Sequence, residues 1–226
     1  MNNISLKPTP FIISVSLVLA VTIFICAFAA SCGNSYLEFN ACYYFVCYSM
    51  EDNSVSASSM SSAVSNYGGA GYILEYNGAY YVTVSCYYEE RDANAVKKEL
   101  NGRGLKCSVL KIETKKYRLQ TAYAKKNSSL YRGNLNTLHS LSQMAYKCAN
   151  ALDTGEYNQT KAKNVINDIK NGLNGLLTAN EGNVFSTEIR RLLAECSDAA
   201  DGYVYSKDLR KLQIAIADGI INAKLI

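Results

Sequence analysis

The stretch that decides the fold runs from Asn77 to Glu113 and reads NGAYYVTVSCYYEERDANAVKKELNGRGLKCSVLKIE. From Tyr80 to Tyr88 the residues alternate between two sets, and this period of two is typical of a half-buried β-strand. After an acidic turn, apolar residues recur at helical spacing, at Ala93, Val96 and Leu100. A second strand, Leu105 to Ile112, follows the glycines that end the helix. The stretch therefore predicts a strand, a helix and a strand.

The residues before this stretch repeat its pattern. The run YYFVCY at 43–48 aligns with YYVTVS at 80–85, and a weak apolar stripe follows it at 53–66. Asn77-Gly78 is a strong hairpin signal between two further strands. The predicted elements are strand 41–49, helix 53–66, strand 70–76, strand 79–88, helix 91–101 and strand 104–113. The alternative is that residues 40–66 form an aromatic membrane-interface segment followed by a serine-rich linker.

The run YYVTV, the acidic turn, and DANAVKKELNGRGLKCSVLKI with its short strand resemble half of a SPOR (sporulation-related repeat) domain. The resemblance implies a small βαββαβ fold that binds peptidoglycan and prefers glycan strands without stem peptides. Members of this family commonly follow a membrane anchor. For this chain the resemblance implies a non-catalytic, peptidoglycan-binding protein that acts in cell division or sporulation.

Residues 11–30 form an uncharged, mostly apolar run, and about 20 such residues in a helix cross a bilayer core of about 30 Å. Lys7 precedes the run and the next cationic residue is Arg91, so the positive-inside rule predicts a cytoplasmic segment 1–10. The remainder is then expected outside the cell membrane, held by this single-pass transmembrane helix. Two alternatives are a cleaved signal peptide and a lipoprotein signal that ends before Cys32.

Helical patterns dominate from residue 114 onward. Apolar residues step by three and four in several stretches, and breaks fall at 153–155, 178–183 and 201–202. One long helix is predicted from Lys115 to about Leu152, and short breaks favour antiparallel neighbours in a bundle. The predicted fold class is α+β, with a transmembrane helix, a ferredoxin-like SPOR-type domain over 37–113 and a helical bundle over 114–226.

Alternation predicts a candidate glycan-binding surface on the two central strands. With Val82 and Val84 in the core, their neighbours face the other way, onto an open face. Aromatic rings pack against the C–H surfaces of sugars, and hydroxyl groups bond to sugar hydroxyls. The predicted glycan-binding residues are Tyr44, Tyr48, Tyr81, Thr83, Ser85 and Tyr87. The alternative is that the C-terminal helices cover this face.

The sequence gives little support for catalysis. A zinc amidase needs at least two His and a carboxylate, and this chain has a single His, so no metal site or other cofactor is predicted. Glu75, Glu89 and Glu90 fall at predicted strand ends, where solvated carboxylates are the ordinary expectation. The eight cysteines include no C-x-x-C pair, and buried free thiols are favoured over a disulfide framework.

The partners expected are peptidoglycan glycan strands and the membrane that holds the anchor. Nucleic acid is not expected, because the tyrosine-rich half lacks the basic residues that RNA-binding sheets carry. Basic clusters at 115–118 and 125–126 favour a solvated helix face over contact with anionic polymer. The competing function is a scaffolding protein whose helical domain binds a protein partner.

Overall fold

The computed structural model describes residues 35–119, 121–183 and 185–223, with the backbone alone described at 115 and 123. The predicted transmembrane helix 11–30 and the segment 1–10 lie outside these residues. No helix in the described ranges is long and apolar enough to cross a membrane. The expectation of a single-pass protein with extracytoplasmic domains is therefore corrected, because the described part of the chain contains no membrane-spanning helix that supports it.

Four strands and two helices make up the first part of the described chain. They are β1 (Ser35–Glu51), α2 (Ser54–Asn66), β2 (Tyr72–Tyr76), β3 (Ala79–Tyr87), α3 (Glu90–Gly102) and β4 (Ser108–Leu119). The strands form one sheet in the order β2-β3-β1-β4, and β3 pairs antiparallel with both of its neighbours. This βαββαβ order and strand arrangement is that of a ferredoxin-like sheet. Asn77 and Gly78 both have positive φ, 52° and 79°, as a two-residue hairpin turn between β2 and β3 requires.

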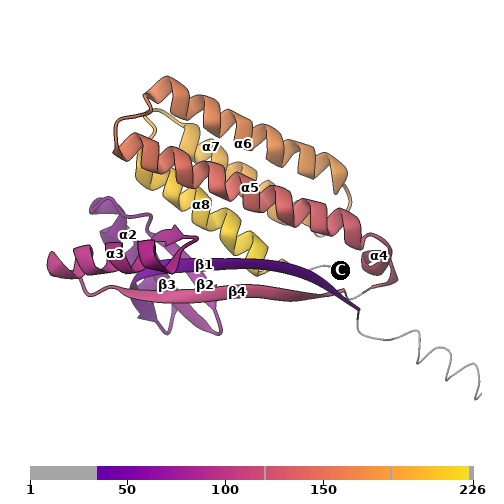
Figure 1. Cartoon of the computed structure of the whole chain (residues 1–226), viewed down its shortest axis with the longest axis horizontal. Coiled ribbons are helices and arrows are strands. Elements are labelled where there is room, and N and C mark those ends of the chain that lie inside the picture. Colours follow the sequence, from indigo (N-terminus) through magenta and orange to yellow (C-terminus); the bar gives the residue numbers. More distant parts are fainter. Residues whose placement is uncertain (1–34, 120, 184, 224–226) are drawn as a thin grey trace, which may run out of the picture. The chain divides into compact units, whose positions relative to one another are not determined.

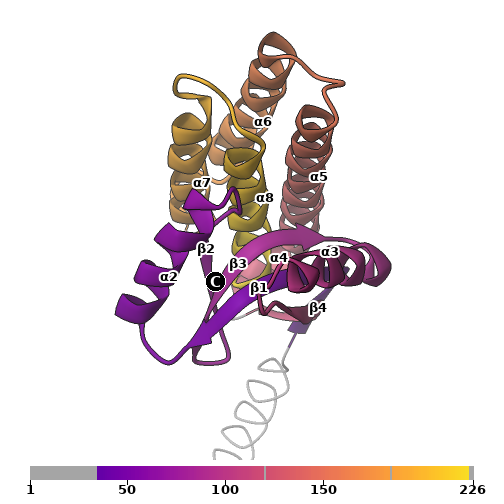
Figure 2. The ribbon, with the colours of Figure 1, turned by 90° about the vertical axis from the view of Figure 1, so that its left-hand side faces the viewer.

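Five helices follow the sheet. They are α4 (Ala122–Lys126), α5 (Ser128–Asp153), α6 (Gln159–Ala179), α7 (Phe185–Ala200) and α8 (Ser206–Ile221). Figure 1 shows α5 and α8 lying along one face of the sheet, with α6 and α7 farther from it. In Figure 2, turned by 90°, α8 lies between α5 and α7. This position explains why α8 is apolar almost all round, from Leu212 to Ala217, since neighbours surround it on several sides.

Both faces of the sheet are covered near the middle of β1 and β3. On one face Tyr43, Phe45 and Cys86 belong to the large core that continues through the helices α5 to α8. On the other face Val46 and Tyr87 pack with Ala93 of α3. A third cluster, which contains Val82, packs against α2. The sheet is therefore the middle layer between two layers of helices.

A double irregularity in the pairing of β1 and β3 changes which side chains face which layer. Val46 pairs with Ser85, but Cys47 pairs with Thr83, so the pairing skips Val84 on β3. The next pair, Ser49 with Val82, skips a residue on β1. A skipped residue reverses the alternation of side chains along its strand.

The expected boundary between two domains at residue 113 is corrected. Residues Tyr36–Ile226 form a single compact unit, and the boundary falls inside β4. The Oη atom of Tyr117 in β4 donates a hydrogen bond of 2.7 Å to the carbonyl oxygen of Ile220 in α8. The predicted helix from Lys115 is also wrong at its start, because Tyr117 and Leu119 are buried alternate residues of a strand. Helix α5 begins at Ser128, beyond the short helix α4.

Candidate binding site

The structure does not bring the six predicted glycan-binding residues onto one open face. Thr83 and Ser85 are 0% and 3% exposed, and Tyr87 is buried against α3. Tyr44 and Tyr48 are half-buried at the edge of the same cluster, whereas Tyr81 packs against the core on the opposite face. The Oγ1 atom of Thr83 donates a hydrogen bond of 2.8 Å to the carbonyl oxygen of Tyr72, so its polar group is used within the sheet.

Two physical reasons account for this outcome. The skipped Val84 places Cys86 on the face opposite Val82 and Val84, although strict alternation predicted one shared face. The helices α5 and α8 also cover the face that a free ferredoxin-like sheet would leave open. Tyr88 illustrates the contact, because its Oη atom lies 2.7 Å from the Oγ atom of Ser142 in α5.

An open sheet surface remains on the outer part of β1 and β4. In the first half of β1, Leu37 and Phe39 are buried against the helices, and the intervening residues face away from them. In β4 the residues that alternate with buried Ile112 and Tyr117 are likewise exposed. We call this surface the ribbon face, and its residues are Tyr36, Glu38, Asn40, Cys42, Tyr44, Lys111, Glu113, Lys116 and Arg118.

Contacts between the two strands show that these side chains share a surface. The Nζ atom of Lys116 lies 3.8 Å from an Oε atom of Glu38. The Nζ atom of Lys111 lies 5.9 Å from the centre of the Tyr44 ring, and Lys111 also forms an ion pair with Glu113. A shallow hollow of about 270 Å³ lies in the ribbon, lined by Asn40, Ala41, Cys42, Glu113 and Thr114.

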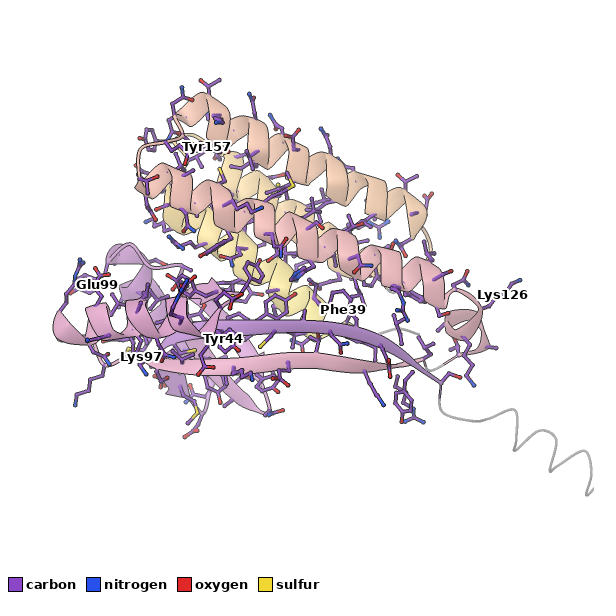
Figure 3. The ribbon with its side chains drawn as sticks, in the orientation of Figure 1. Phe39, Tyr44, Lys97, Glu99, Lys126 and Tyr157 are labelled. Carbon is purple, nitrogen blue, oxygen red and sulfur yellow. The ribbon has the colours of Figure 1, made fainter. Side chains whose placement is uncertain are left out.

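The ribbon face has the chemistry of a surface for polar ligands. Its cations and carboxylates are largely paired, so little net charge is presented. Tyr36 is 52% exposed at one end of the surface, and Tyr44 is half-buried towards α3 (Figure 3). A hydrogen bond with Cys42 raises the pKa of Tyr44, so the phenol stays neutral at physiological pH and its oxygen can accept a hydrogen bond.

No sign of a metal centre was found among the described residues, in which no group of three or more His, Cys, Asp or Glu side chains could hold an ion. Glu75, Glu89 and Glu90 are exposed. His139 is half-buried, and its Nδ1 atom lies 3.0 Å from the Oη atom of Tyr43. Six cysteines in the described ranges are free thiols, and burial raises the pKa of Cys47 to about 12. Five of the six are buried, and the raised pKa of each of these five keeps it protonated and unreactive at neutral pH.

Sequence reasoning missed most of the ribbon face because it started β1 too late. The signal was present, since Leu37 and Phe39 alternate with polar residues before the predicted strand start at residue 41. Arg118 was missed for the corresponding reason, because the polar stretch after Glu113 was assigned to a helix. Two long strands therefore carry the surface that was expected on the sheet centre.

Comparisons with known proteins identified no relative of this chain. Scans of protein-family models, of curated proteins and of solved structures found no match to the chain.

Proposed function

We propose that the protein is a non-catalytic peptidoglycan-binding protein whose glycan ligand lies along the ribbon face. The observation that carries the proposal is the open surface between Tyr36 and Tyr44. The two tyrosines are eight residue steps apart along β1, which corresponds to about 26 Å at about 3.3 Å per step. An extended polymer fits such a distance better than a compact ligand does.

The groups between the two rings match the hydroxyl groups of a sugar chain. Asn40 offers both a donor and an acceptor, and the hollow beside it is wide enough for a polar substituent. Tyrosine rings contribute stacking against sugar C–H surfaces. The ferredoxin-like strand order also agrees with the fold that the SPOR resemblance implies. The proposal differs from that resemblance in placing the ligand on the outer strands, because helices cover the sheet centre.

Protein binding is the second candidate function, and exposed apolar side chains around α2 favour it. Met50, Val55, Met60 and Tyr67 are 61%, 79%, 37% and 83% exposed. These residues lie at the end of β1 and on α2 rather than on the C-terminal helices. A scaffolding role through the C-terminal helices, the alternative drawn from the sequence, therefore receives less support than one through α2.

The test is co-sedimentation of residues 36–226 with cell-wall sacculi, with and without amidase treatment. Replacing Tyr36 and Tyr44 together by Ala removes both rings. Each ring contributes about 1 kcal/mol of stacking, so the affinity of the protein for sacculi should fall about 30-fold. The matched control replaces two other exposed tyrosines, Tyr67 and Tyr203, and should sediment like the unmodified protein.

Unchanged retention of the Tyr36/Tyr44 variant would contradict the ribbon as the binding surface. Absence of retention of the unmodified protein on both kinds of sacculi would contradict glycan binding itself. If the Tyr67/Tyr203 variant alone lost retention, the glycan would bind at Tyr67 beside α2 or at Tyr203 between α7 and α8, and not on the ribbon face.

A further inference from the structure

A second cavity, distinct from the ribbon face, lies between the start of α7 and the end of α8. Its volume is about 310 Å³. Helix α7 contributes residues of its first two turns, the last turn of α8 contributes Asp218 and Gly219, and Asn222 and Ala223 directly follow α8. The cavity is lined by Phe185, Thr187, Glu188, Arg191, Asp218, Gly219, Asn222 and Ala223. We call it the α7–α8 cleft.

The guanidinium of Arg191 has little capacity left for a ligand. Its Nε and Nη2 atoms donate to Glu188, with the shortest distance 2.6 Å, and Nη2 also donates to the carbonyl oxygen of Ala215 at 3.1 Å. Its Nη1 atom lies 3.2 Å from the Oη atom of Tyr72. An Arg side chain has five N–H donors, and most of them are therefore committed to protein partners.

The carboxylate of Asp218 keeps unused acceptor capacity. It accepts one hydrogen bond of 2.6 Å from the Oη atom of Tyr72 and one of 2.6 Å from the Nδ2 atom of Asn222. A carboxylate has about four lone-pair sites. Arg191 lies 3.9 Å away, beyond direct hydrogen-bonding distance. Burial raises the pKa of Asp218, and the hydrogen bonds from Tyr72 and Asn222 oppose this increase.

The charges that line the cleft sum to a net negative value. Glu188 and Asp218 carry two carboxylates, and Arg191 carries the only positive side-chain charge among the lining residues. The amino end of α7 and the carboxyl end of α8 both meet here, and their opposite dipole charges offset each other. A site with surplus acceptors and net negative charge favours a ligand that is cationic and rich in N–H donors.

We propose that the α7–α8 cleft binds a small organic cation with a primary ammonium group, held by Asp218 and Glu188. The ammonium meets the free acceptors of Asp218, and the apolar stem lies against Phe185 and Ala223. This binding site is independent of the proposed glycan-binding function, because none of its residues belongs to the ribbon face.

Gly219 keeps Glu188 in place for this ligand. A Cβ atom at position 219 would lie 2.5 Å from the Oε1 atom of Glu188. Any side chain there displaces the carboxylate without changing the charge of the cleft. Gly219→Ala therefore tests the geometry, whereas Asp218→Asn tests the charge.

The experiment is isothermal titration calorimetry of residues 36–226 with 1,4-diaminobutane at low ionic strength. The unmodified protein should bind one equivalent saturably, and 1,4-butanediol, of similar length but uncharged, should not bind. Loss of one charged hydrogen-bond partner should weaken binding about tenfold or more in Asp218→Asn. The matched control is Glu195→Gln on the same helix α7, whose carboxylate pairs with Lys211 at 3.2 Å outside the cleft.

Weaker diamine binding by Asp218→Asn and Gly219→Ala, with Glu195→Gln unchanged, supports the proposal. Thermal melting of each variant identifies loss of folding, and Gly219→Ala serves as the test if Asp218→Asn does not fold. Equal binding of the diamine and the diol, or no binding of the diamine by the unmodified protein, would overturn it. Retention on sacculi should be the same for the cleft variants and the unmodified protein, which separates this proposal from the glycan-binding one.

Discussion

His139 joins helix α5 to the sheet, and its protonation should weaken this junction. The ring lies between Tyr43 and Tyr88, with ring-centre distances of 5.8 and 5.4 Å. Burial lowers the pKa of His139 from its ordinary value of 6.5. As the pH falls, the unfolded chain therefore binds the proton first, and this favours unfolding.

The stabilising contribution of neutral His139 should be fully present above about pH 6.5 and be lost as the pH falls through the lowered pKa. Replacing His139 with Gln removes this titration. The difference in melting temperature between the two proteins should change from pH 7.5 to pH 5.0, with the unmodified protein losing more. Tyrosine fluorescence can follow the melting, since the chain contains 18 Tyr and no Trp. Equal decreases in melting temperature in the two proteins would show that other groups cause the acid sensitivity.

At the scale of elements, two glycines of α6 differ in how closely they pack against α5. A Cβ atom at Gly172 would lie 2.8 Å from a Cδ atom of Leu141, whereas one at Gly175 would meet nothing within 4 Å. Gly175→Ala should raise the unfolding free energy by about 0.5–1 kcal/mol, because Ala is the better helix former. Gly172→Ala gains the same propensity but overpacks the buried contact, which costs about 1–3 kcal/mol. Urea denaturation of both variants measures the difference, and equal stability would show that α6 does not pack closely at Gly172.

The positions of the helices and strands along the chain were largely predictable from local chemistry. The side of the sheet that each strand residue faces was not. The turn at Asn77-Gly78 and the breaks after α5 and α7 contain residues that readily adopt a positive φ, among them Gly155 and Gly202. The skipped pairing at Val84 has no comparable local signal, since YVTVSCY alternates without interruption in the sequence. For this reason the strand position was correct, but the predicted binding face was wrong. The start of β1 at Ser35 could have been found, because Leu37 and Phe39 already follow the strand period.

For the whole molecule, the sheet and the helices should fold only together. The face that bears Tyr43, Phe45 and Cys86 is completed by α5 and α8. A protein of residues 36–119 should therefore expose a large apolar surface, bind the dye ANS and lack a cooperative thermal transition. Residues 36–226 should unfold in one transition. A cooperative transition in the shorter protein would show that the sheet is an independent domain.

The separation of the molecule into two domains was the main error of sequence reasoning at this scale. The pattern that contradicts it lies in α8, where Leu212 to Ala217 reads LQIAIA and offers no polar face of ordinary width. Such a helix needs partners on several sides, and the bundle alone supplies too few. Which surface supplies the remaining partner depends on contacts between residues far apart in the chain, and a single sequence does not contain that information. The residues of the α7–α8 cleft were missed for the same reason, since Tyr72 lies far from Arg191 and Asp218 in the sequence.

The central position of α8 also sets the timing of folding during synthesis. Ser206, where α8 begins, follows the end of β1 at Glu51 by 155 residues. At a translation rate of about 5–20 residues per second, the interval between them is about 8–30 s. During this time the apolar face of the nascent sheet has no α8 to cover it, and chaperones that bind exposed apolar surface have time to act. The yield in the cell should therefore depend on synthesis rate and chaperone supply as well as on the stability of the finished protein.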